Sequence, residues 1–223
     1  MATRLDAFRA RGEAGDTFER LDAGLYAEHG VFASTMIGTK IIYGSARSAG
    51  PGFENTASGI VEVEGFAQRT IASGAFGVVS ARTAIARPAS LAAGARPGLA
   101  ADGVDLEARA LYGIGFGGPV AGFFSLEAAY RGRTGLAADQ ARFDAILGFE
   151  PHQDFLLMAE AQTAFSVGDP RPGGADFDVV KLQPSIVWRA NSKFALRAGG
   201  LIEVASRNLT PGRGVFISFW SEF

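Results

Sequence analysis

Apolar and polar residues alternate along this chain with a period of two residues. Between residues 104 and 110, for example, Leu106 and Ala108 alternate with Glu107 and Arg109. The same alternation occurs in residues 61–68, where it places Val61 on the apolar face, and in residues 143–149, 157–163 and 194–203. The 3.6-residue period of a helix is nearly absent. A two-residue period is that of a β-strand, so the pattern predicts an all-β protein.

The pattern predicts twelve strands, at residues 2–10, 21–32, 35–46, 57–69, 74–86, 103–115, 119–131, 139–149, 153–166, 176–189, 193–205 and 213–223. The first is the least regular, because residues 3–9 alternate only roughly. Short connections (around 33–34, 72–73, 117–118, 151–152 and 191–192) alternate with longer ones (47–56, 87–102, 132–138, 167–175 and 206–212). Transmembrane barrels have this asymmetry and an even number of strands. We therefore expect a closed antiparallel up-and-down transmembrane β-barrel, formed by residues 1–223 as a single domain.

Composition narrows the class of protein. The chain has 30 glycines among 223 residues and no cysteine, which excludes disulfides and thiolate metal sites. A net charge of −2 leaves no basic surface for nucleic acid. No run of 18 apolar residues occurs, so the chain has no transmembrane helix. The start lacks the apolar segment of a signal peptide. We expect a protein of the bacterial outer membrane whose export signal has been removed from this chain.

Alternation alone does not say whether the charged face points to water outside or into a lumen. Small residues recur on the apolar face, which suits contact with lipid better than a densely packed core. Aromatic residues on that face lie near strand ends, as membrane girdles do. We expect Tyr43 and Tyr130 at the outer rim, and Tyr112, Phe149 and Trp188 at the inner rim. The charged face is therefore predicted to line the lumen.

The chain ends on a strand with an aromatic last residue. Val215, Ile217, Phe219 and Phe223 share one face of residues 214–223. This ending resembles the C-terminal signal of bacterial outer-membrane proteins, with Phe219 and Phe223 in the signal positions. Residues 25–30, 181–185 and 212–216 resemble segments shared by a group of outer-membrane barrels to which no reaction is assigned. The resemblance implies contact with outer-membrane lipid and lipopolysaccharide, and with the barrel-assembly machinery during biogenesis.

The predicted lumen carries acidic and basic side chains in nearly equal number. We expect its lining to include Lys40, Glu62, Glu64, Arg82, Glu107, Arg109, Glu127, Arg142, Asp144, Glu160, Lys181, Arg197 and Glu203, with Glu28, Asp105, Arg131, Arg189 and Glu222 on the same face. Eight-stranded barrels are filled by side chains, whereas barrels of about 16–18 strands leave a channel. Twelve strands allow either a passive channel or uptake pore for small polar solutes, without strong ion selectivity, or a closed structural barrel. The closed barrel would serve as a subunit or anchor in an outer-membrane assembly, with an envelope protein as its partner.

Other candidate chemistry is sparse. His29 and His152 are the only histidines, and no acid is placed to orient the ring of His29 toward Ser34. We expect no enzymatic activity, no cofactor and no metal site. Residues 113–118 match G-x-G-x-x-G, but a hairpin turn explains them better than a nucleotide site, because no helix begins there. Pro184 interrupts a predicted strand, and we expect a bulge or an inserted water near residues 183–185.

Overall fold

The computed structural model describes residues 1–12, 15–88, 103–118 and 120–222, and these form twelve antiparallel strands closed into one barrel. The strands are β1 (Ala2–Arg11), β2 (Thr17–Phe32), β3 (Thr35–Gly50), β4 (Phe53–Gly74), β5 (Gly77–Pro88), β6 (Asp105–Phe116), β7 (Ala121–Arg133), β8 (Asp139–His152), β9 (Phe155–Val167), β10 (Asp178–Arg189), β11 (Phe194–Arg207) and β12 (Gly212–Ser221). No helix in the described ranges is long and apolar enough to cross a membrane. The predicted fold class is confirmed.

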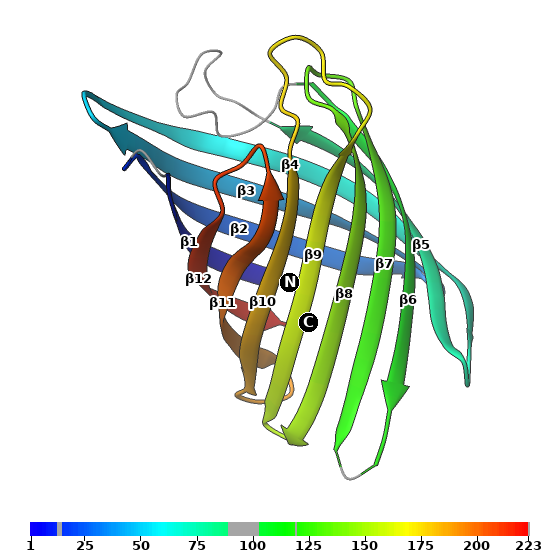
Figure 1. The fold of residues 1–223 in the computed structure, drawn as a ribbon. Helices are drawn as coiled ribbons and strands as arrows, with labels where there is room; N and C mark the ends of the chain where they lie inside the picture. Colours follow the sequence, from blue (N-terminus) through cyan, green and yellow to red (C-terminus); the bar gives the residue numbers. More distant parts are fainter. Residues whose placement is uncertain (13–14, 89–102, 119, 223) are drawn as a thin grey trace.

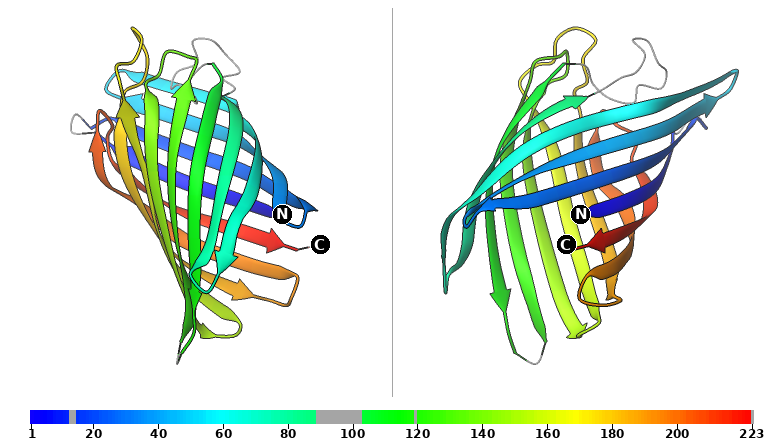
Figure 2. Two further views of the ribbon diagram at one scale, coloured as in Figure 1. Left: turned by 90° about the vertical axis from the view of Figure 1, so that its right-hand side faces the viewer. Right: turned by 180° about the vertical axis from the view of Figure 1, so that it is seen from behind.

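Each strand pairs with its neighbours in sequence, and β1 pairs with β12 to close the barrel. Ala2 lies opposite Trp220, so the two ends of the chain are side by side (Figure 2). In Figure 1, β6–β11 run steeply across the front, and β1–β5 cross obliquely behind them. We call the end of the barrel with connections 33–34, 75–76, 117–120, 153–154 and 190–193 the turn end, and the opposite end the loop end.

The β3–β4 hairpin is longer than the sequence pattern predicted. The expected loop at residues 47–56 is strand on both sides, and the turn consists of Pro51 and Gly52 alone. Gly52 has a φ of +84°, which fits the third position of a type II turn that has proline at the second. The hairpin extends beyond the other strands of the loop end (Figure 1). Tyr43 consequently lies near the middle of β3, and its expected position at the rim was wrong.

Two other predicted turns are displaced along the sequence. The β4–β5 turn lies at Ala75 and Phe76, because β4 continues through the residues 72–73 where a turn was expected. Residues 151–152 belong to β8, and the next turn lies at residues 153–154. Residues 113–116 are the end of β6, and Gly117 and Gly118 belong to the connection that follows. Residues 89–102 of the expected loop at 87–102 lie outside the described residues.

A β-bulge changes the face on which one predicted residue lies. The register between β3 and β4 shifts between Ile42 and Tyr43, so that Val61 is the extra residue of β4. Val61 is buried and packs with Ala46 inside the barrel. Its predicted place on the outer apolar face was therefore wrong, because one inserted residue reverses the alternation locally.

Pro184 is accommodated without the expected bulge. The register between β10 and β11 is the same on both sides of it, from Leu182–Ile202 to Ser185–Gly199. The register shift in this pair lies instead between Val180 and Lys181, which is closer to the loop end. The prediction of a bulge at residues 183–185 is thus wrong, and the irregularity of this strand pair lies at residues 180–181. We infer that the ladder tolerates the missing N–H of one proline there without a shift.

Candidate functional site: the lumen of the barrel

Charged side chains occupy the inner face of most strands. Each of the thirteen residues predicted to line the lumen lies on this face, and none is more than about a third exposed. The alternation of the strands places them there, because paired residues of neighbouring strands share a face and the outer face takes the apolar side chains. Asp105 and Arg131 lie inside as well, and both are buried. Glu222 lies beyond the end of β12 and is exposed.

Arg131 of β7 is the centre of the largest group of ion pairs. Its guanidinium lies 2.9 Å from the carboxylate of Glu107, 3.2 Å from Glu62, 3.4 Å from Glu64 and 3.6 Å from Asp105. The side chain is only 4% exposed. A buried charge is tolerated only when opposite charges and hydrogen bonds surround it, and here acidic residues of β4 and β6 supply both.

Other cations complete this network on the inner face of β3–β8. Arg109 donates to Glu107 at 2.9 Å, to Asp144 at 2.7 Å and to Glu127. Each of the remaining four cations contacts one or two of the same carboxylates: Lys40 with Glu62 and Glu64, Arg82 with Glu64, Arg133 with Asp105, and Arg142 with Glu107. Six cations thus face six acids, and we call this group the ion-pair network. It is neutral overall.

Two further ion pairs lie on the opposite wall. Arg197 of β11 contacts Glu160 of β9 at 2.9 Å, and Lys181 of β10 contacts Glu203 of β11 at 3.3 Å. The Phe216 ring of β12 is buried below the guanidinium groups of Arg4 and Arg197, whose Cζ atoms lie 3.9 and 4.9 Å from its centroid. The thirteen predicted residues therefore form two groups rather than one continuous ring.

The inner faces of β1 and β2 carry charges that the sequence pattern did not single out. Arg4 pairs with Asp6 at 2.6 Å, and Arg20 with Asp22 at 2.8 Å. With Lys40 and Lys181 these side chains keep between 22% and 34% of their surface exposed, although they point inward. We call Arg4, Asp6, Arg20 and Asp22 the open strip. The centre of the ion-pair network is buried, whereas the charged groups of the open strip are partly exposed.

Apolar side chains also enter the lumen near the turn end. Leu156, Met158 and Val187 are buried together, and Phe123, Ile146, Ala195 and Trp220 pack against them. We call these seven residues the apolar cluster. Residues 155–159 are apolar at successive positions, and a strand that is apolar on both faces is one that is covered on both faces. This apolar run in the sequence therefore indicates that the lumen is partly apolar, which the alternation of the other strands does not show.

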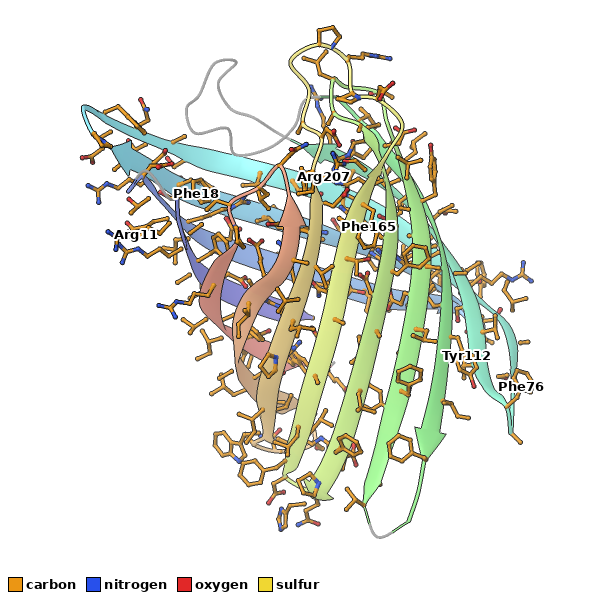
Figure 3. The ribbon with its side chains drawn as sticks, viewed as in Figure 1. Arg11, Phe18, Phe76, Tyr112, Phe165 and Arg207 are labelled. Carbon is orange, nitrogen blue, oxygen red and sulfur yellow. The ribbon has the colours of Figure 1, made fainter. Side chains whose placement is uncertain are left out.

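A cavity of about 320 Å³ opens inside the barrel toward the loop end. Its lining comes from the inner face of β8–β10 and includes Gln140, Arg142, Gln162 and Lys181. These groups donate and accept hydrogen bonds, so the cavity suits a small polar molecule better than an apolar one. At the rim nearby, Arg207 donates to Asp178 and Asp176 at 2.7 Å (Figure 3 labels Arg207). The hydrogen bonds from Arg207 hold the pKa of the Asp176 carboxyl below its usual range.

The remaining candidates lie apart from the lumen. His29 is exposed on β2, and His152 lies at the turn end with Nδ1 3.5 Å from the carboxylate of Asp154. Within the described ranges, no three His, Asp or Glu side chains are placed to hold a metal ion. Phe219 is exposed on the outer wall and stacks on Phe194 with 5.5 Å between ring centroids. Phe223 lies outside the described residues.

No protein-family model and no curated protein sequence matches the chain. Solved structures do match its fold. An outer-membrane channel from Pseudomonas putida F1 aligns with a TM-score of 0.74 and 10% identity, over 100% of this chain and 95% of that one. The transport unit of the autotransporter AIDA-I from Escherichia coli aligns with a TM-score of 0.62 and 13% identity, over 100% and 90%. The NanC porin aligns with a TM-score of 0.58 and 9% identity, over 98% and 100%. This chain therefore has the fold of the outer-membrane β-barrels.

Proposed function

We propose that the protein spans the bacterial outer membrane as a narrow passive channel for small polar solutes. The membrane location is supported by the outer wall, where large apolar side chains such as Leu106, Phe143 and Val215 are more than half exposed. Apolar residues of this size cover the wall on all sides of the barrel. A soluble protein rarely exposes so continuous an apolar surface, because water disfavours it. In a bilayer the same surface contacts lipid.

The open strip is the observation that carries the channel proposal. A closed barrel of this size would bury its inward charges, as the centre of the ion-pair network buries Arg131 and Glu107. The charges of Arg4, Asp6, Arg20 and Asp22 instead remain accessible along the inner face of β1 and β2. We propose that solutes pass along this strip, between the ion-pair network and the wall formed by β10–β12. Arg4 narrows the route, because it reaches across the lumen to Gln183 at 2.8 Å.

The channel proposal is tested with the refolded full chain in two assays. We expect discrete current steps in a planar bilayer, and swelling of proteoliposomes in a small neutral sugar. Heat-modifiable migration in electrophoresis shows in parallel that the barrel is folded. A folded barrel that gives neither steps nor swelling would contradict the channel.

A closed structural barrel is the second candidate function. It is supported by the apolar cluster, which covers part of the lumen at the turn end, and by the burial of Arg131 and Asp105. In this case the barrel would serve as an anchor or subunit of an envelope assembly, and its rim would carry the interaction. Neither candidate requires an enzymatic reaction or a cofactor, and we propose none.

A further inference from the structure

Two arginines face each other on the outer wall where the barrel closes. Arg9 of β1 lies directly opposite Arg213 of β12 in the register, near the loop end. Like charges in this position destabilise a sheet unless another charge compensates them. Arg9 contacts the carboxylate of Glu19 at 3.4 Å, whereas no carboxylate of the described residues contacts Arg213. The pair therefore carries a positive charge that the described residues do not neutralise.

The neighbouring outward positions add to this positive charge. Glu19 lies 3.8 Å from a second arginine, Arg47 of β3, which also contacts Glu54 at 2.9 Å. Arg11 is the next outward residue of β1 and points away from the barrel (Figure 3). At the loop end, four described arginines and two described glutamates thus lie on the outer faces of β12 and β1–β4. These side chains are solvent-exposed at the loop end, where a membrane barrel meets the lipid headgroups.

The arginines border a groove with an apolar floor. The groove has a volume of about 830 Å³ and is formed by β11, β12 and β1–β4. The side of the groove toward the loop end is lined by Arg9, Arg47 and Arg213, with Glu19 between Arg9 and Arg47. The next row of outward residues toward the middle of the wall includes Ala7, Leu21 and Val215, which pair across the same strands. Leu21 and Val215 are more than half exposed. The groove is cationic at one end and apolar at the other.

We propose that this groove binds an anionic membrane lipid, with its phosphate headgroup on Arg9 and Arg213 and its acyl chain on the apolar floor. Guanidinium groups bind phosphate through two parallel hydrogen bonds, and two arginines side by side present two such forks. Free phosphate would leave the apolar floor uncovered, so the proposal is specific to a lipid. It rests on the proposed membrane location, but not on transport through the lumen.

The test uses the refolded full chain in neutral detergent and native mass spectrometry. Bisphosphorylated lipid A is the probe, and zwitterionic phosphatidylcholine is the comparison. Lipid A should bind and phosphatidylcholine should bind more weakly. The variant Arg9→Gln/Arg213→Gln should weaken lipid A binding by about tenfold or more, because it removes the charge-assisted hydrogen bonds. If this variant does not fold, Arg213→Gln alone replaces it, since Arg213 has no ion-pair partner among the residues that the structure describes.

A matched control removes the same charge elsewhere on the outer wall. Arg69→Gln/Arg87→Gln changes two exposed arginines of β4 and β5 and should leave lipid A binding unchanged. Equal loss in both double variants, or equal binding of the two lipids to the unchanged chain, would overturn the proposal. Displacement of lipid A by inorganic phosphate at the same concentration would overturn the assignment to a lipid. A folded barrel that conducts without binding lipid A contradicts this inference alone, and one that binds without conducting contradicts the channel alone.

Discussion

Replacing Arg131 by methionine should destabilise the barrel strongly. The change keeps much of the side-chain volume and removes the charge at the centre of the ion-pair network. Arg131 lies within 4 Å of four carboxylates and is 4% exposed, so the lost interaction is shielded from bulk water. Removing one partner of a buried ion pair costs about 3–5 kcal/mol. Each of the four acids keeps another cation, so we expect the lower end, about 3 kcal/mol.

The assay is a urea titration of protein refolded into lipid vesicles, followed by tryptophan fluorescence and heat-modifiable migration. Arg47→Met is the control, because Arg47 has an ion pair of the same 2.9 Å length on the exposed outer wall. Exposed pairs contribute about 0–1 kcal/mol, so this variant should differ little from the unchanged chain. In the double variant Arg131→Met/Glu107→Gln the cost should be smaller than the sum of the two single costs, because the partners are coupled. Equal free energies of unfolding for Arg131→Met and Arg47→Met would refute the reasoning.

Three further predictions concern the outer wall, the apolar cluster and the last strand. Leu106→Arg on the outer wall should cost about 2–4 kcal/mol in the same titration. An unchanged free energy of unfolding for Leu106→Arg would mean that the charged face is outside. Leu156→Ala should increase single-channel conductance by opening the apolar cluster, whereas Leu157→Ala on the outer face should leave it unchanged; equal conductance would exclude the cluster as a constriction. Phe219→Ala should lower the yield of heat-modifiable protein in membranes without lowering synthesis, and an unchanged yield would remove Phe219 from the assembly signal.

The strand pattern was sufficient to predict the closed twelve-stranded barrel and the faces of most strands. The face of a residue follows from the alternation along its whole strand, so an error of a few residues at a strand end does not alter it. The displaced turns at 72–73 and 151–152 therefore changed few of the predicted faces. The bulge at Val61 could not be predicted in this way. A valine is equally acceptable on the outer wall and in a packed part of the lumen, and the residue that is inserted becomes visible only in the register of the partner strand.

The open strip was missed for a different physical reason. A strand that crosses a membrane alternates clearly only where its outer face contacts the apolar part of the bilayer. In β1 the outward residues Arg9 and Arg11 are charged, and so are the inward residues Arg4 and Asp6. Alternation is therefore weak in residues 3–9, and the charges of β1 were not assigned to either face. The weak signal at the loop end of β1 is itself consistent with contact between Arg9 and lipid headgroups.

The distribution of charge in the lumen also decides which solutes the proposed channel would favour. In the described part of the lumen, every cation of the ion-pair network and of the open strip has a carboxylate within 4 Å. The same holds for Lys181, which lies 3.3 Å from Glu203. An ion that enters must compete with these existing pairs and gains little from them. A neutral polar solute needs only hydrogen bonds, which the exposed carboxylates and guanidinium groups offer without being separated. We therefore expect proteoliposome swelling in neutral sugars to be pronounced and ionic current to be small, with little preference for either sign of charge.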